Sequence, residues 1–339
     1  MRIELRSDTF TKPTPDMLEA MFRAEVGDDV FREDPTVNLL EEEIAEYFGM
    51  ESALFCASGT MSNQIAIKCH TQPGDEIICD ENSHVFLYEG GGIAFNSGCQ
   101  TRILKGDRGR LNKEMIEPYI NPDDVHKPRT RLVSLENTAN RGGGSCYSED
   151  AIADISALCR TRGIALHLDG ARIWNAIIAG RQSPRWYAEH FDTLSVCMSK
   201  GMGAPVGSLL VGSHSMIQQA RRIRKIFGGG MRQAGYLAEA CRYALKHHLP
   251  LLERDHQHAR QLVSVLERKS FVGEILPVET NIVIAEILPP YTAHSLVEKL
   301  KTIGIDSMPI AAHQIRMVFH LGVDDQMTNY VCEQLDLLQ

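Results

Sequence analysis

Short runs of apolar and β-branched residues alternate with helix-like stretches over residues 53–227, and this alternation limits the folds open to the chain. Such alternation is typical of a parallel sheet covered by helices on both faces. The runs lack polar alternation, as expected for strands that are buried on both faces. Helices are expected at 62–70, 148–162 and 214–227, and strands at 53–56, 76–80, 102–105, 131–135, 164–168, 193–198 and 207–211. The sequence therefore predicts an α/β domain with a mostly parallel, seven-stranded sheet.

The last third of the chain has a different pattern. A long helical pattern at 234–255 leads out of the α/β region. Beyond it, helices are expected at 262–269, 292–303 and 325–338, and strands at 272–275, 281–285 and 314–319. This order is typical of a small α+β domain. We therefore expect a large domain at 1–245, whose N-terminal segment contributes to the functional site, and a small C-terminal domain at 246–339.

The charge balance of the chain disfavours two classes of partner. The 339 residues include 35 basic and 44 acidic side chains, which gives a net charge of −9. An acidic surface disfavours nonspecific binding to nucleic acids and to anionic membranes. The chain shows neither the apolar core of a signal peptide nor an apolar run of about 18 residues that could span a membrane. The nine cysteines are scattered and form no CxxC pair, so we expect a cytoplasmic protein with reduced thiols.

Three segments combine into a candidate cofactor site. Lys200 follows one expected strand, Asp169 ends the strand before it, and Ser58-Gly59-Thr60 lies where a third strand turns into a helix. Ligands of parallel α/β sheets bind outside the carboxyl ends of the strands. Taken singly, the lysine is interpreted as a solvated side chain and Ser58-Gly59-Thr60 as a helix N-cap, while Asp169 fits a helix N-cap and a cofactor partner equally well. Together, an amine for a Schiff base, a carboxylate for a pyridine nitrogen and a helix N-terminus for a phosphate predict pyridoxal 5′-phosphate (PLP).

Two further side chains suit such a site. Arg172 offers a planar guanidinium that fits a substrate carboxylate. His84 follows another expected strand, where an imidazole can stack on a pyridine ring or exchange a proton near neutral pH, although a lone histidine is more often structural. The chain has neither GxxxxGK(S/T) nor GxGxxG, which disfavours P-loop and dinucleotide-binding folds. We expect no metal site, since His256 and His258 do not share a helical face and are interpreted as surface residues.

Seven blocks of the sequence resemble those of the low-specificity L-threonine aldolases. They follow the family's order over most of the first 235 residues, and the C-terminal third matches more loosely. The blocks are Arg6-Ser7-Asp8-Thr9, Val26-Gly27-Asp28-Asp29-Val30, Glu33-Asp34-Pro35-Thr36-Val37-Asn38, Ser58-Gly59-Thr60-Met61, Leu135-Glu136-Asn137-Thr138, 167–172 and 199–207. The resemblance implies a transferase-like PLP enzyme of fold type I. It also implies a lyase that cleaves L-threonine, L-allo-threonine and related β-hydroxy-α-amino acids to glycine and an aldehyde, such as acetaldehyde.

The resemblance also implies how the cofactor is held. Lys200 would form the internal Schiff base with PLP, and Asp169 would bind the pyridine nitrogen. His84 would stack on the ring, and Ser58-Gly59-Thr60 would hold the phosphate. Arg172 would lie close enough to contact the cofactor as well as the substrate.

Further positions match residues around the substrate. The substrate carboxylate would be bound by Ser7, Arg172 and Arg316. His126 matches a histidine near the substrate side chain. In this family Lys225 and Arg232 reach the site from a neighbouring subunit, so a homodimer, usually paired into a homotetramer, is implied.

Three departures from the family pattern leave the substrate preference open. Phe31-Arg32 stands where many members have Tyr-Gly, Ala139 replaces a histidine, and Cys56-Ala57 differs from the usual residues. The threo or allo preference is not readable, and the catalytic base is either His84 or an ordered water near His126. A β-eliminating lyase or an aminotransferase of the same fold is the alternative enzyme. A non-catalytic PLP-binding protein is the alternative outside catalysis.

Overall fold

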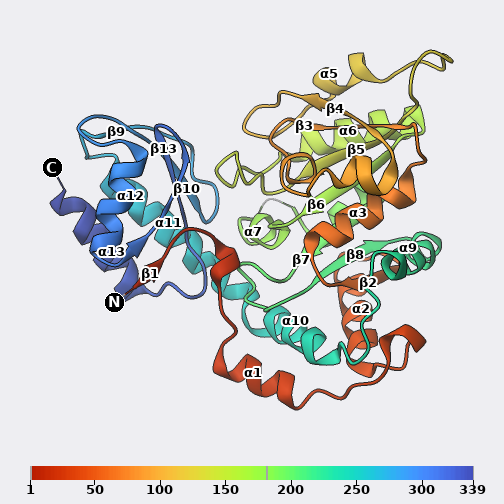
Figure 1. Cartoon of the computed structure of the whole chain (residues 1–339), viewed down its shortest axis with the longest axis horizontal. Coiled ribbons are helices and arrows are strands. Elements are labelled where there is room, and N and C mark those ends of the chain that lie inside the picture. The colour runs from red at the N-terminus through yellow and green to blue at the C-terminus, as the bar shows by residue number, and fades with distance from the viewer. Residues whose placement is uncertain (1, 181, 339) are drawn as a thin grey trace.

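A computed structural model describes residues 2–180 and 182–338, and its larger lobe is built on one seven-stranded sheet (Figure 1). In spatial order the strands are β2 (Ser52–Cys56), β8 (Ser208–Gly212), β7 (Thr193–Cys197), β6 (Ala165–Gly170), β5 (Thr130–Glu136), β3 (Glu76–Asp80) and β4 (Gln100–Leu104). In this sheet β8 runs antiparallel to β2 and β7, and the other neighbouring pairs are parallel. The mostly parallel sheet is therefore confirmed, and each predicted strand overlaps one of these seven.

Helices cover both faces of this sheet. One face carries α3 (Gly59–His70) and α9 (His214–Ile226), and the other carries α2 (Pro35–Phe48), α6 (Glu149–Arg162), α8 (Pro184–His190) and α10 (Gly235–His247). The two faces have separate apolar cores. Leu54 and Phe55 are consecutive in β2, yet Leu54 packs with Ile65 of α3 while Phe55 enters the cluster that holds Phe48 of α2. Burial on both faces explains why the strand sequences are continuously apolar.

The smaller lobe is an antiparallel sheet packed against helices. Its strands, in spatial order, are β12 (Met308–Ala311), β13 (Gln314–Val318), β10 (Ile282–Ile287) and β9 (Val272–Ile275). Its helices are α11 (Leu252–Leu266), α12 (Ala293–Thr302) and α13 (Asp325–Leu337). The lobe has the α+β character expected of the C-terminal domain, and the boundary between residues 245 and 246 stays a prediction.

The N-terminal strand belongs to the smaller lobe in space. β1 (Ile3–Glu4) pairs in parallel with β11 (Ile305–Asp306), and Ile3 and Leu5 are buried in the apolar cluster of this lobe (Figure 1). The chain then crosses to the large lobe through a short 3₁₀ helix, η1 (Asp8–Phe10). Residues just after Leu5 are thereby placed between the two lobes.

The predicted helix at 234–255 is in fact two helices, because Pro250 interrupts it. A 3₁₀ turn at Leu249–Leu251 separates α10 from α11, and proline has no N–H with which to continue a helical hydrogen-bond ladder. His256 and His258 of α11, interpreted from the sequence as surface residues, are both buried. That interpretation was wrong because α11 is covered on more than one side.

Several helices were not predicted from the sequence. They are α1 (Pro15–Phe22), α4 (His84–Leu87), α5 (Lys113–Ile116) and α7 (Ile173–Ile178), together with α2 and α8. The segment 262–269, expected as a separate helix, holds the end of α11. Among the described residues, no helix combines the length and the apolar character needed to cross a bilayer.

Candidate active site

The candidate site lies where four neighbouring strands end. Asp169 and Glu136 are paired across β6 and β5, at the carboxyl ends of both strands. His84 begins α4, four residues after β3 ends at Asp80, and Lys200 comes three residues after β7 ends at Cys197. Because β3, β5, β6 and β7 are parallel neighbours, these side chains gather at one edge of the sheet.

One carboxylate oxygen of Asp169 is buried with no hydrogen-bond donor among the described residues. Its side chain is buried, and Oδ1 accepts a hydrogen bond of 3.1 Å from the amide of Ala171. Its Oδ2 is also buried but has no hydrogen-bond partner among the described residues. A buried carboxylate oxygen without a donor is costly and rare. A protonated pyridine nitrogen would supply that donor, so the site fits PLP.

His84 lies beside this carboxylate. A ring nitrogen of His84 and carboxylate oxygens of Glu89 and Asp169 all lie within 4.8 Å of one another. Nδ1 of His84 is 2.9 Å from Oε1 of Glu89. Burial alone lowers the pKa of His84, but the Glu89 hydrogen bond and the charges of Asp169, Glu89 and Glu136 outweigh burial and raise this pKa above its usual value. His84 is therefore an imidazole that holds a proton more firmly than a free one.

Glu136 links the segment of His84 to the segment of Asn140 through two hydrogen bonds. Its Oε2 accepts the amide of His84 at 2.7 Å, and its Oε1 accepts the amide of Asn140 at 2.8 Å. Burial and, second, the charge of Asp169 raise the pKa of Glu136 to about 7. The sequence block 135–138 contained this residue, but no role was predicted for it.

The predicted carboxylate-binding arginines lie next to each other. Asn140 Oδ1 accepts from Nη1 of Arg172 at 3.3 Å and from Nη1 of Arg316 at 2.9 Å. Nε of Arg316 is buried and has no partner among the described residues. Burial and, second, the charge of Arg172 lower the pKa of Arg316 to about 10. Two adjacent cations with an unused N–H form a place for an anion such as a carboxylate.

Asp8 is the main residue that sequence reasoning missed. Its two carboxylate oxygens accept from Nε and Nη2 of Arg172 at 2.7 and 2.8 Å, and both side chains are buried. Burial alone raises the pKa of Asp8, but the charge and hydrogen bonds of Arg172 outweigh burial and lower this pKa to about 2. The Nε and Nη2 groups of Arg172, a side chain predicted to bind the substrate carboxylate, thus donate to Asp8 instead. Ser7, the predicted neighbour of the substrate, is buried at the start of η1.

The predicted phosphate cradle is a helix N-terminus. Ser58 caps α3, with its Oγ accepting from the amide of Met61 at 3.1 Å. The amides of Gly59 and Thr60 lie in the first turn, where no helical carbonyl can accept from them. The end of β2 is joined to the end of β7 through β8, since Ser208 pairs with both Cys56 and Cys197. The cradle therefore lies near the turn that carries Lys200.

The turn after β7 is built around glycines. Nζ of Lys200 lies 3.6 Å from Sγ of Cys197, and the lysine is partly buried. Gly207 has a φ of 131°, and a Cβ there would lie 2.8 Å from Sγ of Cys241 and 2.9 Å from the ring of Phe55. A glycine is required at this position.

Three predicted site residues lie elsewhere in the same chain. The side chain of His126 is 87% exposed, in the segment that leads into β5, at the opposite end of that strand from Glu136. Lys225 lies near the end of α9, and Arg232 donates from Nη1 to Asp28 at 2.7 Å. Within the part of the chain that the structure describes, none of the three forms a hydrogen bond or ion pair with Asp169, His84 or Lys200. The roles of Lys225 and Arg232 stay predictions that require a second subunit, and the role of His126 stays a prediction.

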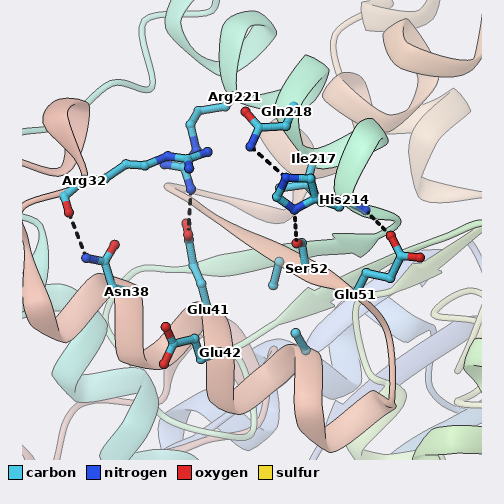
Figure 2. Close-up of a pocket in the computed structure, with 12 residues that line it drawn as sticks. Arg32, Asn38, Glu41, Glu42, Glu51, Ser52, His214, Ile217, Gln218 and Arg221 are labelled. Atoms are coloured by element: carbon cyan, nitrogen blue, oxygen red, sulfur yellow. Dashed lines mark hydrogen bonds and ion pairs between the residues drawn. The ribbon is translucent and has the colours of Figure 1, made fainter.

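A separate hollow of about 340 Å³ lies between α2 and α9 (Figure 2). Two of its side-chain contacts cross from one wall to the other, since Arg221 lies 2.6 Å from Glu41 and His214 lies 3.2 Å from Ser52. Ser52 begins β2, so this hollow opens at the end of the strand away from the phosphate cradle. Arg32, one of the departures, lines the hollow and has a φ of 63°, a region where glycine is favoured.

The chain is similar to named proteins over nearly its whole length. Residues 4–288 match the model of a family described as beta-eliminating lyase. The chain is 40% identical to a probable low-specificity L-threonine aldolase 2 of Arabidopsis thaliana, over 97% of this chain and 95% of the relative. It is also 40% identical to the low specificity L-threonine aldolase of Escherichia coli K12, over 95% of this chain and 94% of the relative.

A solved structure supports the fold independently. The threonine aldolase of Leishmania major has a TM-score of 0.86 to this chain, with 98% of each chain covered and 20% identity. The fold expected from the sequence blocks, fold type I of the PLP enzymes, is confirmed.

Proposed function

The chain belongs to the beta-eliminating lyase family and, within it, to the low-specificity L-threonine aldolases, and on this premise we propose that it cleaves L-threonine and L-allo-threonine to glycine and acetaldehyde with PLP. One observation carries the proposal most directly. Oδ2 of Asp169 is a buried acceptor to which no residue in 2–180 or 182–338 donates, at the strand ends that also carry His84 and Lys200. When bound, PLP supplies an aldehyde for the substrate amine and a conjugated ring that accepts the electrons of the Cα–Cβ bond.

Each side chain of the site has a separate task in this proposal. The amine of Lys200 would hold the cofactor aldehyde, and Asp169 would accept the pyridinium N–H. The amides at the start of α3 would bind the phosphate. Arg316 and Arg172, with Ser7, bind the substrate carboxylate and so orient the bond that breaks. The base that removes the β-hydroxyl proton is His84 or a water near His126.

Three residues that make no described contact with the site side chains of their own chain support an assembly of several subunits. Lys225, Arg232 and His126 match site positions of the family, but within residues 2–180 and 182–338 none of them forms a hydrogen bond or ion pair with Asp169, His84 or Lys200. We propose a homodimer or homotetramer in which these residues complete a neighbouring site. The nine cysteines are scattered along the chain and eight of them are buried, which supports the proposed cytoplasmic location.

Product analysis tests the function. Purified protein is incubated with L-threonine and, separately, with L-allo-threonine, and both products are quantified. Acetaldehyde and glycine should form in equal amounts. Borohydride treatment before the substrate, in the presence of PLP, should abolish turnover and leave the cofactor attached at Lys200. Pyruvate with ammonia, or a keto acid, would instead identify the β-eliminating or aminotransferase alternative.

A further inference from the structure

Glu89 is a buried carboxylate that the reaction proposed above does not use. It follows α4, and its side chain is fully shielded from solvent. Its Oε1 lies 2.9 Å from Nδ1 of His84 and accepts from Nδ2 of Asn63, also at 2.9 Å. Its Oε2 accepts from Nε2 of Gln64 at 2.6 Å. Three nitrogen groups therefore converge on one carboxylate, which is the arrangement that makes a buried charge tolerable.

The orientation of both amides is determined by their other contacts. The Oδ1 of Asn63 lies 3.1 Å from Nε2 of His167. Burial and, second, the charge of His70 lower the pKa of His167 to about 3, so this ring is neutral near pH 7. A flipped Asn63 amide would place its oxygen against the Glu89 carboxylate, which is two acceptors in contact. Asn63 therefore directs its NH₂ group to Glu89, and His167 donates from Nε2.

Gln64 is oriented in the same way. Its Oε1 accepts from Nδ2 of Asn96 at 3.2 Å, which leaves its NH₂ group for Glu89. The segment that follows Glu89 in the chain passes very close to the side-chain amide of Gln64. A Cβ at Gly92 would lie 2.6 Å from Cδ of Gln64, so a side chain at this position would displace the amide from its present place. The surroundings of Glu89 thus consist of donors held in place.

The protonation of His84 follows from this arrangement. Glu89 can only accept, so the Nδ1 of His84 that faces it must carry a proton. The Nε2 of His84 makes no hydrogen bond to any residue in the described ranges. In the neutral ring this nitrogen has a free lone pair, in a side chain that is 32% exposed at the site.

We propose that Glu89 is a positioning residue that holds His84 as the Nδ1–H tautomer and leaves Nε2 as the atom that takes the proton of the substrate β-hydroxyl. This rests on the proposed function. The O–H bond breaks and an N–H bond forms at Nε2. The former O–H electron pair becomes the second bond of the aldehyde carbonyl, and the electron pair of the Cα–Cβ bond remains with the glycine part. Glu89 then stabilises the imidazolium that results.

The charged groups that face His84 all act in the same direction. They are Glu89, Asp169 at the end of β6 and Glu136 at the end of β5, and each of their charges raises the pKa of His84. Replacing Glu89 by glutamine removes one of these charges and the hydrogen bond together. The acid limb of the pH profile should therefore move to lower pH in E89Q.

Histidine NMR tests the tautomer without any turnover. Protein labelled with ¹⁵N-histidine, free of cofactor, is recorded at pH values above the titration of His84, and H84Q identifies the signals of this ring. Wild type should show the Nδ1–H form. E89Q should gain the Nε2–H form, because the new amide can donate to Nδ1. A wild-type ring in the Nε2–H form would overturn the proposal even if E89Q did not fold.

Kinetics test the role of the tautomer. E89Q should lose about 10²-fold in kcat on L-threonine, the lower range for general-base catalysis, with KM nearly unchanged. Glu89→Asp, which keeps the charge, should recover part of the loss. Glu81→Gln, in the same connecting segment, is the matched control and should behave as wild type. An altered tautomer in E89Q with wild-type kcat and pH profile would refute the assignment of Nε2. A wild-type chain that shows the Nδ1–H form but does not cleave threonine would contradict the proposed function alone.

Discussion

Asp8 and Arg172 form a buried two-pronged ion pair across 164 positions of sequence, with N–O distances of 2.7 and 2.8 Å. The pair joins the segment after β1 to the turn after β6, so it connects the two lobes at the site. Arg172 is thereby held rigidly next to Arg316, whose Nε has no hydrogen-bond partner in the described part of the chain. The position of the proposed carboxylate site depends on an acid from the start of the chain.

Asp8→Asn should destabilise the protein strongly. Removing one partner of a buried pair leaves the other charge uncompensated, at a cost of about 3–5 kcal/mol. Urea unfolding at pH 7 measures the loss, and Asp16→Asn on the exposed side of α1 is the control. The pKa of Asp8 is lowered to about 2, so its contribution is present above its unfolded pKa and disappears as the pH falls through about 2. Unchanged stability in D8N would contradict the importance of the pair.

Asp255 should make the stability of the protein fall as the pH rises. Both of its oxygens are buried without a partner among the described residues. Burial and, among smaller influences, the charge of Asp8 raise the pKa of Asp255 to about 8, against the opposing charge of Arg254. A raised folded-state pKa gives stability that is complete below the unfolded pKa and lost as the pH increases to about 8.

Replacing Asp255 by asparagine should remove this dependence. Urea midpoints for D255N and wild type at pH 5 and pH 8.5 are compared, with Asp154→Asn on α6 as the control. The advantage of D255N should be larger at the higher pH. An equal difference at both pH values would show that Asp255 does not titrate with folding.

Asp169→Asn should weaken the hold on PLP. A hydrogen bond to a charged group contributes about 1.5–3 kcal/mol, so affinity should fall by about 10- to 150-fold. Fluorescence titration of the cofactor-free protein with PLP measures this directly. Asp154→Asn serves as the control here too. Wild-type affinity in D169N would mean that the unpartnered Oδ2 does not face the cofactor.

Arg316→Gln should impair substrate binding rather than cofactor binding. Loss of a charged partner for a carboxylate should raise KM for L-threonine by about 10-fold or more, since hydrogen bonds to charged groups contribute about 1.5–3 kcal/mol. PLP titration should remain as in wild type. Arg131→Gln, exposed on β5, is the matched control. A fall in PLP affinity with normal KM would place Arg316 at the cofactor instead.

Shared sites predict complementation between two inactive variants. Lys200→Ala removes the amine, and Arg232→Gln removes the residue expected from the neighbouring subunit. A mixed dimer then contains one site with both changes and one with neither, so an equal mixture after subunit exchange should recover about a quarter of wild-type activity. No gain over the separate variants would show that Arg232 serves its own subunit or none.

The sheet, and the position of the candidate cofactor residues at its strand ends, were predictable because their signals are local. A run such as 53–56 is apolar on both faces, and Lys200 lies directly behind a strand and before glycines. The partners of these residues were not predictable in this way. Asp8 contacts Arg172, and Glu89 contacts Asn63, only because the fold brings these residues together. The spacing of the residues in the sequence does not predict either contact. The break at Pro250 was visible in the sequence, but a continuous helical pattern on both sides obscured it.

The pairing of β1 with β11 has a consequence for how the protein is made. Ile3 leaves the ribosome long before its partner Ile305, which is synthesised some 300 residues later. Until then Asp8 has no fixed position, and Arg172 would have to be buried without its counter-ion. The large lobe can form its strands during synthesis, but a competent carboxylate site must wait for the finished chain. A product truncated before Ile305 should therefore lack this site even where its sheet has folded.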